Sequence, residues 1–75
     1  PLTIQINPAK LLLSKWTAVK PANKEKHFLV TKLIEPENEG DPLEWIELEA
    51  IYSKRIVMMN WRELKNQDNW LQGWQ

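Results

Sequence analysis

The chain has 75 residues, ten lysines and arginines against ten acids, and no cysteine. This length accommodates one domain with one hydrophobic core, and the lack of cysteine excludes disulfides, thiolate metal ligands and cysteine nucleophiles. A net charge of zero gives no general attraction to nucleic acid or to anionic lipid.

The first segment predicts a short helical turn. Asn7 is a good capping residue, and Pro8 suits the first position of a helix. Residues 1–6 lack the positive start and apolar stretch of a signal peptide, and no apolar run approaches the roughly 20 residues of a membrane span. We therefore expect a cytoplasmic protein that forms a single domain over residues 1–75.

Four segments are predicted to be strands. Residues 15–19 are rich in β-formers and end before Pro21, and residues 27–34 are apolar on both faces. Residues 45–52 alternate a core-facing row with a partly acidic row, which is typical of a half-buried antiparallel strand. Residues 56–61 form a fourth strand. The expected core residues are Leu29, Val30, Ile46, Leu48, Ala50, Val57 and Leu64.

Turns and short helices are expected between and after these strands. Residues 35–42 form an acidic segment bracketed by prolines, which predicts the turn of a hairpin. Residues 62–65 favour a helical turn, and residues 68–73 favour a short last helix that ends at a glycine. If the whole tail is helical, Trp70 and Trp74 are i,i+4 neighbours and would share one face. That face would dock on the sheet or serve as a ligand platform.

Several short strands joined by tight turns predict a mainly β domain. The favoured architecture is a small antiparallel meander curled into an SH3-like barrel or half-barrel, with short helical turns near both termini. An open sheet packed on the terminal helices is the alternative.

The charges are unevenly distributed along the chain. Residues 1–34 carry six lysines against one acid, and residues 35–75 carry nine acids against four bases. The two halves of a small barrel interleave in space, so the sequence leaves open whether this asymmetry forms a surface dipole.

No catalytic or metal-binding pattern stands out. His27 is the only histidine, and a zinc site needs further histidine or cysteine ligands. Glu47 and Glu49 would be neighbours on one strand face, as paired carboxylates are in glycosidases, but a solvated strand face is the favoured interpretation. Gly40 and Gly73 belong to no phosphate-binding motif. We expect no enzyme activity, no metal and no cofactor.

Five sequence blocks span most of the chain. They are residues 14–19, 24–28, 48–50, 61–65 and 70–74. Three of them contain tryptophan, and the block 24–28 contains Phe28 close to charged residues. In these blocks the chain resembles a family of small tryptophan-rich bacterial proteins of unknown function. The resemblance implies no activity, cofactor or catalytic residue.

The remaining residues suggest a binding function. The first candidate is a protein-interaction module, because SH3-like barrels often present aromatic grooves to short peptides. The alternative is a nucleic-acid module, in which lysines hold phosphates of RNA and exposed aromatics stack on its bases. A carbohydrate surface built on exposed tryptophan rings is a third possibility.

The candidate binding residues are Trp45, Trp61, Arg62, Lys15, Lys24 and Lys26. Trp45 lies out of phase with the core row of its strand, and Trp61 and Arg62 adjoin a turn where a cation–π contact is feasible. We expect another protein as the partner, with nucleic acid as the alternative and no membrane. The oligomeric state is left open.

Overall fold

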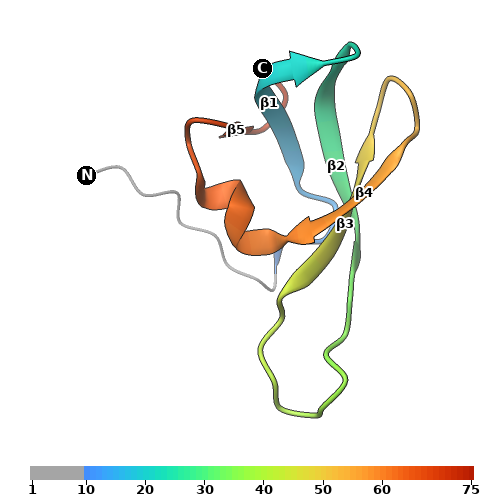
Figure 1. The fold of residues 1–75 in the computed structure, drawn as a ribbon, viewed down its shortest axis with the longest axis vertical. Helices are drawn as coiled ribbons and strands as arrows, with labels where there is room; N and C mark the ends of the chain where they lie inside the picture. Colours follow the sequence, from blue (N-terminus) through green and yellow to red (C-terminus); the bar gives the residue numbers. More distant parts are fainter. Residues whose placement is uncertain (1–9) are drawn as a thin grey trace.

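The computed structural model describes residues 10–75, which form one curled antiparallel sheet (Figure 1). Its elements are β1 (Lys15–Ala22), β2 (Glu25–Leu33), β3 (Trp45–Ala50), β4 (Ile56–Asn60), the 3-10 helix η2 (Trp61–Lys65) and β5 (Trp70–Gln72). The strands lie in the order β4-β3-β2-β1-β5. The mainly β prediction is confirmed. Within residues 10–75 no ladder joins β4 to β5, so the sheet is open at these two edges.

Tight turns and irregular pairing shape the sheet. The β1–β2 turn contains Asn23, whose φ of 55° is a left-handed conformation that asparagine tolerates well. The β1–β2 register shifts between Thr17 and Ala22, and the β2–β3 register shifts between Val30 and Lys32. Such irregularities bend a strand and increase its twist. They account for the curl that gives the sheet an inner and an outer face.

The inner face carries the hydrophobic core. The buried hydrophobic residues are Leu11, Trp16, Phe28, Val30, Ile46, Leu48, Ala50, Trp61 and Leu64. Helix η2 leads from the β4 edge toward β5 and contributes two of them (Figure 1). Most of the predicted core is confirmed. Val57 is half-buried against the core, and Leu29 was wrongly placed there because it alternates with Phe28 onto the outer face.

The C-terminal segment is a strand, so the predicted last helix is wrong. β5 pairs with β1, with Gln72 opposite Trp16, and the Gly73 N–H donates a 2.8 Å hydrogen bond to the Lys15 carbonyl. Pairing with the free edge of β1 therefore stabilises the strand conformation of residues 70–72, which have no strong conformational preference of their own. Trp70 and Trp74 consequently share no helix face.

Helix η2 confirms the helical turn that was predicted at residues 62–65. The Asn60 side chain caps it by accepting a 3.0 Å hydrogen bond from the Arg62 N–H. The turn predicted after Asn7 lies outside the described residues.

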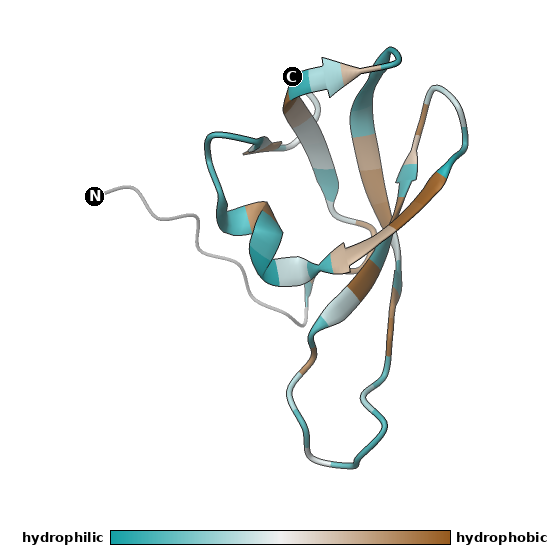
Figure 2. Cartoon of the chain, in the orientation of Figure 1, coloured by the Kyte–Doolittle hydropathy of each residue, from teal (hydrophilic) through white to brown (hydrophobic). Residues whose placement is uncertain are grey.

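The two ends of the sheet differ in charge. The hairpin end consists of residues 20–26 and 52–55, and it carries five bases against one acid. The loop end consists of residues 34–45 and carries five acids with no base. These ends lie at opposite extremes of the molecule (Figure 1), and both are mostly hydrophilic (Figure 2). The uneven charge along the sequence therefore becomes a charge separation in space.

Candidate functional site

A hollow at the loop end lies beside Trp45. It has a volume of about 530 Å³ and is lined by Ile34, Glu35, Pro36, Glu37, Asn38, Asp41, Pro42, Glu44 and Trp45. The Trp45 side chain is 47% exposed, which confirms that it points away from the core. Four lining residues are carboxylates and none is basic, so the hollow has a negative potential. We call it the Trp45 pocket.

Backbone hydrogen bonds hold both sides of the Trp45 pocket. The Ile34 N–H donates to the Trp45 carbonyl at 2.9 Å, which closes the base of the β2–β3 loop. The Trp61 N–H donates to the Glu44 carbonyl at 2.9 Å, and the Trp61 indole N–H donates to the Leu43 carbonyl at 2.8 Å. The buried start of η2 therefore fixes the side of the loop end that leads into β3.

Trp61 is part of the core, so its predicted place on the surface is wrong. Its side chain is 6% exposed because η2 turns the chain back onto the inner face of the sheet. The Arg62 guanidinium lies 5.3 Å from the centre of the Trp61 ring, and the Lys65 ammonium lies 4.9 Å from it. The predicted cation–π contact exists, but it covers a core residue.

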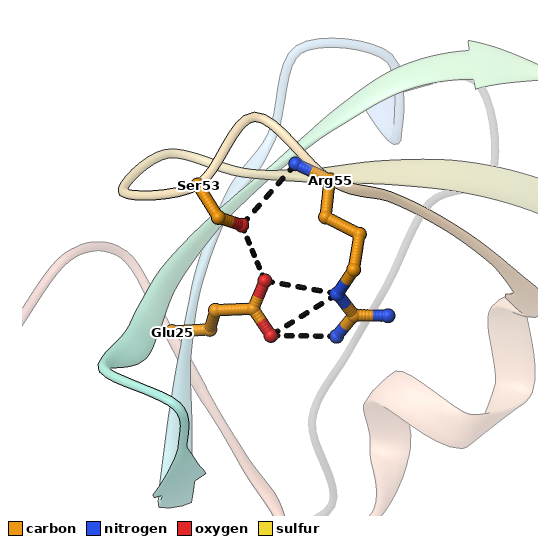
Figure 3. A network of polar contacts seen from close by, with 3 residues as sticks. All are labelled: Glu25, Ser53 and Arg55. Carbon is orange, nitrogen blue, oxygen red and sulfur yellow. Dashed lines mark hydrogen bonds and ion pairs between the residues drawn. The ribbon is translucent and has the colours of Figure 1, made fainter.

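A polar network joins the two turns of the hairpin end (Figure 3). The buried Glu25 carboxylate accepts hydrogen bonds from Arg55 Nε at 2.9 Å and from Arg55 Nη2 at 2.6 Å. The Ser53 hydroxyl donates to the same carboxylate and accepts from the Arg55 backbone N–H. The hydrogen bonds from Arg55, with that from Ser53, lower the pKa of Glu25 to about 2. This network ties the start of β2 to the β3–β4 turn.

An exposed aromatic side chain lies among the bases of the hairpin end. Tyr52 is 66% exposed, and the Lys24 ammonium lies 5.9 Å from the centre of its ring. Lys26 is exposed on the neighbouring strand. Sequence reasoning missed Tyr52, because residues 45–52 were predicted to form one strand with Tyr52 in its core row.

Trp74 lies over the outer face of β1 and β2. Its indole N–H donates a 3.0 Å hydrogen bond to the Phe28 carbonyl, and its ring centre is 5.9 Å from that of His27. The Lys15 ammonium lies 4.9 Å from the ring centre. The Thr17 hydroxyl holds the segment around Trp74, because it donates to the Gly73 carbonyl and accepts from the Gln75 N–H. His27 is thus a half-buried packing residue beside Trp74.

The predicted binding residues do not form one surface. Trp45 lies at the loop end, whereas Lys24 and Lys26 lie at the hairpin end, and Lys15 lies against Trp74. Sequence reasoning missed the carboxylates around Trp45. Their signal was present, because residues 33–53 contain seven acids and no base.

Within residues 10–75 no cluster of three or more histidine, cysteine, aspartate or glutamate side chains is arranged to hold a metal ion. No helix in that range is long and apolar enough to cross a membrane.

Comparison with known proteins supplies a family. A family model described as tryptophan-rich protein (DUF2389) matches residues 14–75, which include all five strands and η2. No curated protein and no solved structure matches the chain. The match confirms the resemblance that the tryptophan-containing blocks suggested. The chain therefore belongs to the tryptophan-rich protein family DUF2389.

Proposed function

We propose that this chain is a non-enzymatic protein-interaction module whose Trp45 pocket takes a basic segment of another protein. The observation that carries the proposal is the half-exposed Trp45 ring in a hollow lined by four carboxylates and no base. We also propose that the curled sheet is an SH3-like half-barrel. Its support is the return of β5 to the edge of β1 and the short helix between β4 and β5.

The chemistry of the Trp45 pocket favours a cationic side chain. An ammonium or guanidinium group over a tryptophan face gains about 0.5–1 kcal/mol when exposed and about 2 kcal/mol when desolvated. The ion pairs within residues 10–75 join Arg55 to Glu25 and Lys54 to Glu49. None of them uses a carboxylate of the loop end. These acids therefore remain available to attract a basic partner, at a strength that falls with salt.

A direct test uses a fluorescein-labelled peptide of alternating lysine and serine, with glutamine in place of lysine in the control peptide. We expect the lysine peptide to raise its fluorescence anisotropy on binding, and the binding to weaken as salt is added. Trp45→Ala should weaken it by about tenfold, the equivalent of about 1.4 kcal/mol. Asp41→Asn should weaken it through the lost charge.

The matched control is Tyr52→Ala, which removes an exposed aromatic ring at the opposite end. It should leave the affinity for the lysine peptide unchanged. The proposal fails if the glutamine peptide binds as tightly as the lysine peptide, or if Trp45→Ala binds like the wild type.

A second candidate function is the binding of single-stranded nucleic acid at the hairpin end. It is favoured by Tyr52, which is 66% exposed and lies beside Lys24. Stacking of a base on an exposed ring is worth about 1–3 kcal/mol. Titration with short RNA and DNA oligomers should then show binding that weakens steeply with salt and that is lost in Tyr52→Ala. A binding affinity that does not change with salt concentration would rule out this nucleic-acid function.

A further inference from the structure

β4 forms an edge of the sheet. It pairs with β3 on one side, and no strand within residues 10–75 pairs with its other side. An open edge presents a row of backbone N–H and C=O groups that can pair with another chain.

The ladder leaves alternate residues of β4 with backbone groups that β3 does not bond. The Ala50 N–H bonds the Arg55 carbonyl, and the Trp61 N–H bonds the Glu44 carbonyl. Paired residues in an antiparallel ladder alternate between bonded and non-bonded pairs. Counting along the register from these two bonds shows that the N–H and C=O groups of Ile56 and Met58 point away from β3.

This edge lacks the usual protection against pairing. Natural edge strands carry lysines, prolines or bulges, whereas Ile56–Asn60 contains no charged residue and no proline, and its register with β3 has no shift. Ile56 and Met58 are 49% and 62% exposed on the outer face. The other edge strand, β5, is only three residues long. An unprotected apolar edge of this kind is suited to receiving another strand.

We propose that the β4 edge pairs with β4 of a second copy of this chain, in an antiparallel arrangement around a two-fold axis. Charge complementarity favours a second copy of the chain in this antiparallel arrangement. β4 begins beside Arg55 at the basic hairpin end and ends beside Glu44 at the acidic loop end. Antiparallel pairing places the acidic end of each copy next to the basic end of the other. A parallel arrangement would place like charges together.

The register that pairs the whole of Ile56–Asn60 is centred on Met58. Met58 then faces its own counterpart, and Ile56 of each copy lies opposite Asn60 of the other. All of these side chains are uncharged, so no ion is buried without a partner. The contact of one short strand pair is smaller than the roughly 1,200 Å² of standard stable interfaces. The dimer is therefore reversible and depends on protein concentration.

Sedimentation equilibrium of the full chain over a range of concentrations tests this proposal. The average mass should rise from that of one chain toward twice that value, and the rise should be smaller at high salt because the opposed ends are then screened. Met58→Lys should stay at the monomer mass, since two ammonium groups would meet at the centre of the interface. Met58→Leu is the matched neutral control and should dimerise like the wild type.

Met58→Pro provides a second, independent variant. Proline at this position removes an N–H that the monomer does not use, and edge strands accept proline there. It should also remain monomeric. A wild type that stays monomeric up to about 1 mM would overturn the proposal, as would a dimer that persists in both Met58→Lys and Met58→Pro.

Hydrogen exchange on the wild type tests the pairing of β4 between two copies if either variant fails to fold. The Ile56 and Met58 amides should exchange more slowly as the protein concentration rises. Exchange rates that do not change with concentration would contradict pairing between copies. This readout does not depend on peptide binding at the Trp45 pocket, so the two proposals can fail separately.

Discussion

The indole N–H of Trp61 donates a 2.8 Å hydrogen bond to the backbone carbonyl of Leu43, so a core side chain on η2 holds the acidic loop. Trp61→Phe keeps an aromatic ring in the core but leaves this carbonyl without its donor. We expect a loss of about 1–3 kcal/mol in the free energy of unfolding, measured by urea denaturation. Affinity for the lysine peptide should fall as well, because the Trp45 pocket loses a support. Unchanged values of both would show that the bond is unimportant.

Trp16 and Trp45 are expected to respond differently to the same substitution. Trp16 is 1% exposed, and Trp16→Ala should cost about 3–5 kcal/mol of stability through the cavity it leaves. Trp45→Ala removes a half-exposed ring and should change stability by about 0.5 kcal/mol or less. Urea denaturation of both variants under identical conditions makes the comparison. Similar losses in the two variants would mean that Trp45 is a structural residue.

Stability at low pH should depend on Glu25. Its folded pKa of about 2 lies below the ordinary value of 4.5, so ionised Glu25 stabilises the fold above that ordinary value. This contribution is lost as the pH falls from about 4.5 toward about 2. Glu25→Gln should therefore be less stable than the wild type at neutral pH, with a difference that shrinks across this window. Thermal unfolding at several pH values measures it.

Glu37→Gln is the control for that experiment. Glu37 is exposed in the β2–β3 loop, far from the Arg55 network. It should follow the wild-type pH profile. A Glu25→Gln protein whose acid sensitivity equals that of the wild type would show that other carboxylates govern acid unfolding.

The Thr17 hydroxyl should matter more than the Thr17 methyl group. It donates to the Gly73 carbonyl at 2.7 Å and accepts from the Gln75 N–H at 2.9 Å. Thr17→Val keeps the shape but leaves both backbone groups without a partner, which should cost about 1–3 kcal/mol. Thr17→Ser should retain most of the stability. Near-ultraviolet circular dichroism should also change in Thr17→Val, because Trp74 lies between the two bonded residues. Equal stability of the two variants would contradict this account.

Strands whose residues alternate between core-facing and polar side chains were predictable from the sequence. Residues 45–52 alternate strongly, and the structure places β3 at Trp45–Ala50. Trp70–Gln72 is too short to show alternation, and its conformation depends on the edge of β1, which is far away in sequence. Local pattern therefore predicted a helix where a distant partner makes a strand.

The candidate site was predictable only in part. Trp45 was identified because it falls out of phase with the core row of its strand. The burial of Trp61 depends on how η2 folds back over the sheet, and the sequence around it indicates only a helical turn. The Trp45 pocket combines a loop with the start of a strand, so neither segment predicts it alone.

The pairing of β5 with β1 has a consequence for how the protein is made. The Thr17–Gly73 hydrogen bond joins positions 56 residues apart, so nearly the whole domain must be available before this contact forms. Contacts of such long sequence separation slow folding. A ribosome therefore releases β1 to β4 and the η2 turn before the strand that completes the sheet. During that interval β1 exposes a second open edge, besides that of β4, to the crowded surroundings of the nascent chain.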